Sequence, residues 1–379
     1  MLTTISSKLQ NSILSWRWWL NMDNLGDKPV PVKSLTIVIT ACNEGKTIGA
    51  CIESVLRQTY NRIHPITIIA VNDASTDNTR EIIDSFADRG VQAIHNPVAT
   101  GRKAGASNLG LAQTKTELFL ALDADGVLDD DAIEKAIRRF SDPNVKMVAG
   151  SVSARNTGTL WEKARYGEYL YAFGAVKKAQ GNTFGVIIAS GCFSLVKTEY
   201  LRELGGYSLR TLAEDLDLTM MFRERRWKVA YASDAVCTVV DPHTYEDFDK
   251  QVTRWSNSFI QNFQVRNWNL FWPNPWLGVF MYAYLIWSIV GPFFLPIVLM
   301  AFTKNIPLSI VSLIGMQAIT VWVPMYIRAI YVKMPLKIVT ASLWPMFAAQ
   351  YVNVWIMYRT LFKIFVLKQS KNDWERGHA

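Results

Sequence analysis

The sequence has few cysteines, and none of them is paired at a short spacing. Its 379 residues include four, Cys42, Cys51, Cys192 and Cys237, with no CxxC pair among them. A zinc knuckle and a disulfide framework both need cysteines at characteristic spacings, so the sequence indicates neither. We expect buried, reduced thiols.

The first 250 residues also lack an apolar run long enough to cross a bilayer. The first 20 have neither the continuous apolar segment nor the cleavage site of a signal peptide, so we expect no cleaved leader. Apolar residues recur there every three or four positions, with Trp16, Trp18 and Trp19 beside Arg17. This pattern predicts an amphipathic helix within residues 1–34 that lies in the membrane surface; the alternative is a helix packed on the protein.

Acidic residues are fewer than basic residues. Lys and Arg total 40 against 32 Asp and Glu, which gives a net charge of +8. Nucleic acid is not predicted as a partner, because basic and aromatic residues cluster near apolar runs, as in a membrane protein with basic flanks.

Within residues 276–367, apolar runs at 277–302, 306–327 and 338–358 predict a multi-pass membrane region, and a basic tail follows at 368–379. No particular oligomeric state is predicted.

The positions of basic residues near these runs are not compatible with three full crossings of the membrane. They mark both the loop after the second run and the tail as cytoplasmic: Arg328, Lys333 and Lys337 in the loop, then Arg359, Lys363, Lys368 and Lys371. A re-entrant or broken third segment, with Gln350 and Asn353 facing protein or water, would satisfy both. The alternative is that the charge bias misleads and the tail lies outside.

Residues 35–243 alternate short β-rich runs with helical stretches. The predicted strands cover residues 35–39, 66–71, 91–95 and 117–122. This alternation predicts an α/β domain with a mostly parallel sheet covered by helices. Residues 161–180 and 244–275 are aromatic, mixed in charge and compatible with helices that lie along the membrane beneath the domain.

Polar residues follow three of the predicted strands, at the sheet edge where ligands gather. Asn43 and Glu44 follow the first strand, and Asp73 the second. Asp73 could accept a hydrogen bond from a uracil imide or close an Asx turn. Asp123 and Asp125 end the last strand, and a carboxylate pair at this spacing suits Mg²⁺ or Mn²⁺ shared with phosphate oxygens. The alternative for this pair is a turn or a helix cap.

Two further motifs add charged groups to the candidate site. Lys103 lies in the segment Gly-Arg-Lys-Ala-Gly, whose flexible backbone and two cations suit a diphosphate just before a helical stretch. Glu214 and Asp215 open another helical stretch. Asp215 could take a proton from an acceptor hydroxyl, or serve only as a partner of the helix dipole.

A last motif places an amide, a guanidinium and an indole within one helical turn, at Gln251, Arg254 and Trp255. Arginine suits phosphate oxygens and tryptophan suits the face of a sugar ring, although an interfacial helix would contain the same residue types.

Together the ordered motifs, over residues 35–272, resemble processive, membrane-integrated family 2 glycosyltransferases. That group includes cellulose, chitin, hyaluronan and poly-N-acetylglucosamine synthases.

The resemblance implies a GT-A fold, a UDP-sugar donor, Mg²⁺ or Mn²⁺, a growing glycan acceptor and inversion to a β-linkage. It assigns the general base to Asp215 beside Glu214, and the metal to Asp123 and Asp125. It implies a set of residues that contact donor or acceptor: Asn43, Glu44, Asp73, Lys103, Asp123, Gly191, Cys192, Gln251, Arg254 and Trp255.

The chain departs from the family pattern at Asn72 and Ala213, where the family often has Asp and Thr. Local resemblances to hyaluronan synthases and to chitin-oligomer and poly-N-acetylglucosamine synthases share one sugar, so the predicted donor is UDP-N-acetylglucosamine. The predicted function is processive elongation of a glycan at the plasma or inner membrane, with the catalytic domain in the cytoplasm. The alternatives are transfer of one sugar to a polyprenyl phosphate or other lipid, and a non-catalytic nucleotide-sugar-binding membrane protein.

Overall fold

The computed structural model describes residues 34–183, 185–271 and 275–369, so the helix predicted before residue 34 lies outside the described residues. The strands are β1 (Leu35–Ala41), β2 (Ile66–Asp73), β3 (Val91–Asn96), β4 (Leu118–Asp123), β5 (Val127–Leu128), β6 (Val145–Ala154), β7 (Ser194–Lys197) and β8 (Lys228–Val239). The first four confirm the four predicted strands. Most of their apolar residues are buried in the main core, because both faces of the sheet are covered; in the edge strand β3 only Val91 is buried.

These strands form one sheet in the order β3-β2-β1-β4-β7-β6-β8-β5. Strands β3, β2, β1 and β4 are parallel, whereas β7 runs antiparallel to both β4 and β6. Strand β6 is parallel to β8, and β5 is antiparallel to β8. The prediction of a mostly parallel sheet is therefore correct for β3, β2, β1 and β4, but the sheet as a whole is mixed. A β-rich run shows where a strand lies, but its direction depends on which neighbour it finds in the folded sheet.

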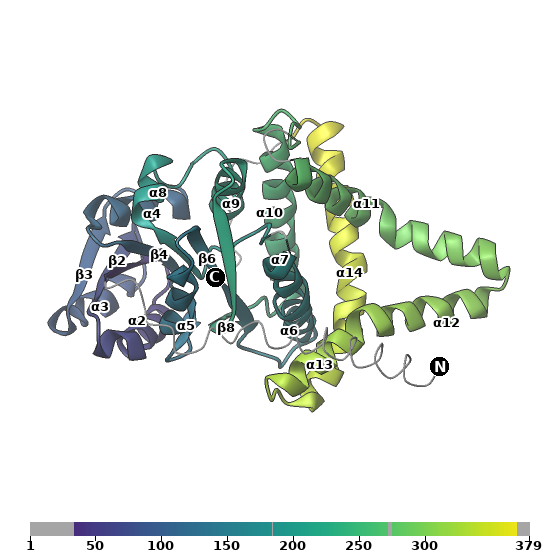
Figure 1. Cartoon of the computed structure of the whole chain (residues 1–379), viewed down its shortest axis with the longest axis horizontal. Helices are drawn as coiled ribbons and strands as arrows, with labels where there is room; N and C mark the ends of the chain where they lie inside the picture. Colours follow the sequence, from purple (N-terminus) through teal and green to yellow (C-terminus); the bar gives the residue numbers. More distant parts are fainter. Residues whose placement is uncertain (1–33, 184, 272–274, 370–379) are drawn as a thin grey trace.

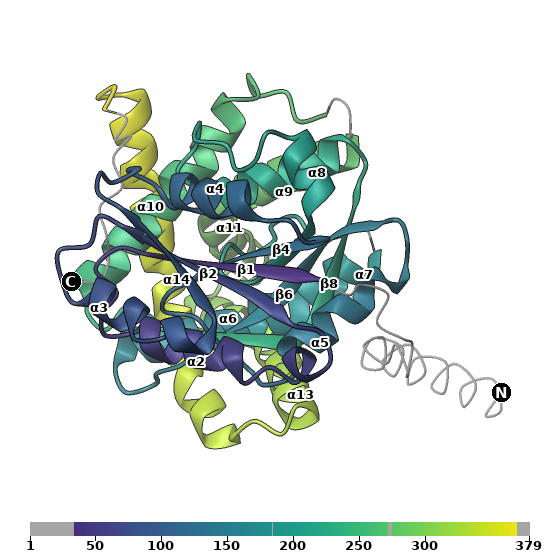
Figure 2. The same ribbon diagram turned by 90° about the vertical axis from the view of Figure 1, so that its left-hand side faces the viewer.

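Helices cover both faces of the sheet; Figure 2 shows α4, α8 and α9 on one side and α2, α3 and α5 on the other. Their bounds are α2 (Ile48–Leu56), α3 (Thr79–Asp84), α4 (Lys103–Gln113), α5 (Ala132–Ile137), α8 (Thr198–Glu203) and α9 (Glu214–Glu224). Short 3₁₀ turns lie at Thr59–Arg62, Ala87–Arg89 and Arg138–Ser141. Helices α4 and α9 begin at Lys103 and Glu214, so both predicted helix starts are confirmed.

Beside the sheet, α6, α10 and α14 stand next to one another (Figure 1). Helix α6 (Leu160–Tyr171) continues through a π-helical turn, Ala172–Val176, into α7 (Lys177–Thr183). Helix α10 spans Tyr245–Gln264 and α14 spans Leu336–Phe365. Apolar clusters join α6 to α14 and α10 to α14, so these three helices pack as one layer.

The close approach of α6 and α14 depends on a glycine. A Cβ added to Gly167 would lie 3.0 Å from Cβ of Met346 and 3.3 Å from the carbonyl oxygen of Ser342. At that separation a larger side chain would push the two helices apart, so the absent side chain of Gly167 sets their spacing.

The remaining helices form a hairpin that projects from the protein (Figure 1). Its first arm is α11 (Pro275–Thr303), and its second arm runs from α12 (Ile306–Gln317) through a π-helical turn (Ala318–Trp322) into α13 (Val323–Tyr331). In the described residues, one helical run, Ile306–Ile330, is long and apolar enough to cross a membrane. A pair bent by 60°, Pro275–Gly291 with Pro296–Thr303, could form a second span. Proline inside α11 accounts for such a bend.

The third predicted span, residues 338–358, is not among these candidates. Helix α14 is also continuous through Pro345, so this segment is not broken at the proline. Its charged and amide side chains lower its mean hydropathy, and several of its residues are buried against α6 and α10. Asn353 faces protein as predicted, because its Nδ2 donates to Oε1 of Glu168 at 2.7 Å.

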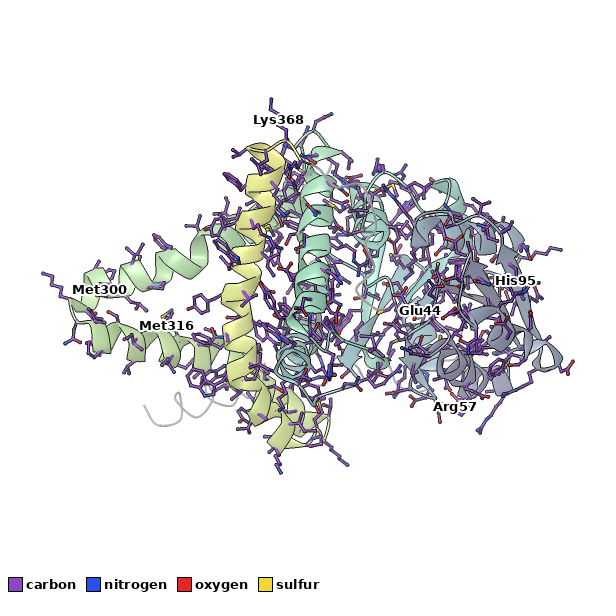
Figure 3. All side chains as sticks on the ribbon, turned by 180° about the vertical axis from the view of Figure 1, so that it is seen from behind. Glu44, Arg57, His95, Met300, Met316 and Lys368 are labelled. Atoms are coloured by element: carbon purple, nitrogen blue, oxygen red, sulfur yellow. The ribbon has the colours of Figure 1, made fainter. Side chains whose placement is uncertain are left out.

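Both ends of the helical segment after α12 are hydrogen-bonded to earlier parts of the chain, one to β8 and the other to α10. Nη2 of Arg328 in α13 donates to the carbonyl oxygen of Ser233 in β8 at 3.0 Å. Nη2 of Arg359 in α14 donates to Oδ2 of Asp249 in α10 at 2.8 Å. Figure 3 shows Met300 and Met316 in the hairpin, Lys368 beyond α14, and Glu44 in the sheet domain on the opposite side. The hairpin therefore leaves the protein and returns to it.

Candidate active site

Asp123 and Asp125 lie where β4 ends, with Asp123 as its last residue. Nζ of Lys103 lies 2.5 Å from Oδ1 of Asp123. Burial, together with the charges of Asp123 and Glu44, raises the pKa of Asp125 to about 7. Nη2 of Arg155 donates to the carbonyl oxygen of Asp125 at 2.7 Å, and its charge opposes that rise. This crowding of negative charge suits a cation at the strand end.

Lys103 is the centre of the site. Besides Asp123, its ammonium donates to the carbonyl oxygen of Gly191 at 2.8 Å and lies 4.0 Å from Oε1 of Glu214. Burial favours the neutral amine, but Asp123 and Glu214 more than offset it and hold the pKa of Lys103 above its usual range. One cation therefore joins β4, the start of α9 and the loop before β7.

Asp215, the candidate base, is hydrogen-bonded to the same loop before β7. The backbone N–H of Gly191 donates to Oδ2 of Asp215 at 2.8 Å. A Cβ on residue 191 would lie 3.2 Å from that oxygen, so glycine permits the close approach. Burial raises the pKa of Glu214 to about 7, with Lys103 opposing the rise and Asp215 adding to it. Glu214 and Asp215 thus lie in one buried network with Lys103 and Gly191.

A second lysine, absent from the predicted site, supports the same loop. Nζ of Lys177 donates to Oγ of Ser190 at 2.8 Å and lies 4.0 Å from the centre of the Phe173 ring. Burial lowers the pKa of Lys177 to about 8, against the opposing charges of Asp215 and Cys192. Arg155 was also missed, since neither residue belongs to a recognisable motif. The π-helical turn just before Lys177 is the local signal that marks this segment, because such turns are frequent at functional sites.

The first two strand ends are tied together by side chains. Asn43 has a φ of 56°, in the left-handed region that asparagine tolerates, and its Oδ1 accepts from the backbone N–H of Thr76 at 2.7 Å. Asp73 accepts from Nδ2 of Asn96 at 2.9 Å and from Oγ1 of Thr100 at 2.7 Å. The carboxylate of Asp73 thereby positions the loop before α4, and its predicted contact with uracil stays a prediction.

The Gln251 motif lies on α10, as predicted. Gln251 is buried, and its Oε1 has no hydrogen-bond partner in the described part of the chain. Trp255 is 41% exposed, and the guanidinium of Arg165 lies 4.5 Å from the centre of its ring. Arg254 is partly exposed on the same helix. The contacts described here join Lys103, Asp123, Glu214, Asp215 and the Gly191 loop into one site, but do not link the α10 motif to it directly.

The two strand-end carboxylates fit Mg²⁺ or Mn²⁺. Both ions prefer oxygen ligands and keep positions for water and phosphate, so a pair of protein carboxylates suffices in a nucleotide site. Among the described residues, no group of three or more His, Cys, Asp and Glu side chains is arranged to hold an ion alone. Asp123 and Asp125 would therefore hold the ion together with a diphosphate, and Lys103 would have to move from Asp123.

The mixed sheet, the carboxylates at the end of β4 and the covering helices together define a GT-A-like glycosyltransferase fold. The chain belongs to the glycosyltransferase-like family 2, whose model matches residues 31–258. The predicted family is thus confirmed.

Two curated relatives are synthases of one polysaccharide. The poly-β-1,6-N-acetyl-D-glucosamine synthase of Staphylococcus epidermidis is 30% identical over 227 residues, which are 59% of this chain and 54% of that protein. The synthase of the same name from Staphylococcus aureus (strain COL) is 28% identical over 238 residues, or 62% and 55%. The chain therefore spans about half the length of the curated relatives it matches.

A solved structure shares the fold over almost the whole chain. The mannosyltransferase PcManGT from Pyrobaculum calidifontis, in complex with GDP-mannose and Mn²⁺, is 18% identical with a TM-score of 0.61. The match covers 97% of this chain and 98% of that one, so it includes the C-terminal helices.

Proposed function

We propose that this chain is an inverting β-glycosyltransferase that uses UDP-N-acetylglucosamine to elongate a membrane-associated glycan. The observation that carries the proposal is the network in which Lys103 joins Asp123, Glu214 and the Gly191 loop, with Asp215 bonded to that loop. It brings a candidate metal site and a candidate base to one sheet edge. The synthase relatives support the sugar and the polymer.

In this mechanism Asp215 takes the proton of the acceptor hydroxyl while that oxygen attacks C1 of the donor sugar. The bond between C1 and the diphosphate breaks, and UDP leaves on the opposite face, which inverts the anomeric centre. A divalent ion bound by Asp123 and Asp125 supplies charge stabilisation for the departing diphosphate. Lys103 adds a second positive charge at the same place, and Arg254 contributes a guanidinium from α10.

Product size tests this function directly. Membranes that contain the protein are incubated with UDP-N-acetylglucosamine and Mn²⁺, and the product is sized and digested with linkage-specific hydrolases. We expect a ladder or polymer of β-linked N-acetylglucosamine that EDTA abolishes and Mn²⁺ restores. A single lipid-linked monosaccharide would instead support transfer to a lipid acceptor. Absence of UDP release with every donor tried would leave only a binding protein.

We further propose that the catalytic domain, residues 35–243, lies on the cytoplasmic face of the cell membrane and that the α11–α12 hairpin enters the bilayer. Large apolar side chains along the hairpin are exposed, including Phe294, Ile297, Ile310 and Ile319. In this proposal the hairpin makes an even number of crossings, because Arg328 after the hairpin bonds to Ser233 in β8 and Arg359 bonds to Asp249 in α10, which precedes the hairpin. This arrangement would satisfy both groups of basic residues with α14 along the membrane surface instead of across it.

Labelling with a membrane-impermeant thiol reagent checks this topology. In intact cells we expect label on Lys304→Cys at the hairpin tip, above the background of the unsubstituted protein. Arg57→Cys in the sheet domain and Lys368→Cys beyond α14 should gain label only after lysis. Label on Lys368→Cys in intact cells would show a third crossing, and protection of Lys304→Cys would show that the hairpin does not reach the far side.

A further inference from the structure

Two lysines from different helices hold the loop before β7. Nζ of Lys103 in α4 donates to the carbonyl oxygen of Gly191, and Nζ of Lys177 in α7 donates to Oγ of Ser190, both at 2.8 Å. The backbone N–H of Gly191 donates to Oδ2 of Asp215. Lys103 belongs to the donor side of the site through its bond to a strand-end carboxylate, but Lys177 has no such task. Its bond to the loop points toward the candidate base.

The π-helical turn Ala172–Val176 sets the direction in which Lys177 leaves its helix. Lys177 is the first residue of α7, directly after that turn. A π-helical turn contains one residue more than an α-helical turn, so it rotates the residues that follow by about 100° relative to a continuous α-helix. The turn also places the ring of Phe173 4.0 Å from Nζ of Lys177. The irregular turn thus aims the ammonium at the loop.

The turn itself is fixed by two other elements. The hydroxyl of Tyr231 in β8 donates to the carbonyl oxygen of Phe173 at 2.7 Å. A Cβ added to Gly174 would lie 2.8 Å from Cγ of Arg328, so the absent side chain lets α13 approach the turn. Contacts with the sheet and with the helix that follows the hairpin therefore hold Lys177 in place.

The charge of Lys177 depends on its surroundings. Its side chain is partly buried, and burial lowers the pKa of Lys177 to about 8. The titratable groups that face it are Asp215 in α9 and Cys192 in the loop, and both oppose this change. Lys177 is therefore a cation below about pH 8 and a neutral amine above it. Attraction between the ammonium and the Asp215 carboxylate exists only in the lower range.

We propose that Lys177 is a positioning residue for Asp215, which it holds through the hydrogen bond to the loop of residues 190–192 and through the attraction of its ammonium. This inference rests on the proposed function, in which Asp215 takes the acceptor proton. When Lys177 is neutral, the attraction is lost and the bond to Ser190 weakens, because hydrogen bonds from charged donors are stronger. Asp215 is then held less firmly, so turnover falls while donor binding stays the same.

The pH dependence of turnover tests this role. UDP release is measured with UDP-N-acetylglucosamine and Mg²⁺ at pH values on both sides of 8. For the parent we expect kcat to fall as the pH rises through about 8, because the ammonium is lost. Lys177→Arg should not show this fall, since a guanidinium stays charged throughout. Lys177→Met should lower kcat about 10–100-fold at pH 7, with the donor KM within twofold of the parent.

Lys163→Met is the matched control. It makes the same change in α6, where Nζ of Lys163 donates to the carbonyl oxygen of Gly158 at 3.3 Å, and it should keep the kcat and the pH profile of the parent. The Tm of Lys177→Met should not fall below that of the parent, because burial disfavours the ammonium that the substitution removes. A Tm that falls together with kcat would show a merely structural role and overturn the inference.

Two further results would refute the role of Lys177 and leave the proposed function standing. One is a kcat of Lys177→Met within twofold of the parent, and the other is an unchanged fall near pH 8 in Lys177→Arg. If the parent itself releases no UDP with any donor, the proposed function fails, and the inference fails with it.

Discussion

Replacing Asp215 by asparagine is expected to lower sugar transfer by about 10²–10⁴-fold, the range for removal of a general base. The amide keeps the shape of the side chain and can still accept from the backbone N–H of Gly191, so the loop should keep its position. It cannot take the acceptor proton. UDP binding, measured by calorimetry in the presence of Mn²⁺, should stay within twofold of the parent, because Asp215 does not contact the diphosphate in this mechanism.

Asp130→Asn is a suitable control, since it makes the same chemical change at an exposed ion pair with Arg57. It should leave transfer unchanged. Glu214→Gln is the informative comparison, because burial raises the pKa of Glu214 to about 7 and a group with that pKa also suits proton transfer. Near-normal turnover of Asp215→Asn together with loss in Glu214→Gln would move the base to Glu214.

The second large effect is expected for Lys103→Met. The substitution removes the cation that lies between Asp123, Glu214 and the Gly191 carbonyl, while it keeps a flexible apolar chain of similar length. Loss of a positive group at the departing diphosphate should lower turnover by about 10²–10³-fold. UDP affinity should fall as well, and both are measured by UDP release and by equilibrium binding.

Lys146→Met provides the matched control, because Lys146 lies at the surface over the ring of Tyr200, away from the site. Its activity should equal that of the parent. Thermal unfolding of Lys103→Met shows whether the lost activity reflects lost folding, since the substitution also leaves buried carboxylates without their cation. Turnover within twofold of the parent would contradict the central role of Lys103.

The C-terminal helices show how tertiary contacts change the meaning of a sequence signal. Residues 338–358 read as an interrupted span, yet α14 packs on α6 and α10 as one continuous helix. Arg328 and Arg359 were markers of a cytoplasmic loop and tail; in the structure Arg328 bonds to Ser233 in β8 and Arg359 bonds to Asp249 in α10. Composition records that a segment is apolar, but only its partners show which part of that surface is covered.

The opening half of the sheet and the helix starts were predictable, because local propensity and short spacings determine them. The runs that became β1, β2 and β4 are continuous and largely buried, and Asp123-Ala-Asp125 lies at the end of the last of them. The direction of β7 was not predictable, since a four-residue strand takes its direction from β4 and β6 on either side.

The sequence by itself determined the family, the candidate chemical groups and the strand ends on which they lie. These features can be read from the sequence because they depend on short motifs and on the order of those motifs along the chain. Tertiary structure alone decided that Lys103 lies between Asp123 and Glu214, which are 20 and 111 positions away. It also placed the guanidinium of Arg165 beside the ring of Trp255. Burial and pairing arise from contacts between distant elements, and no local pattern encodes them.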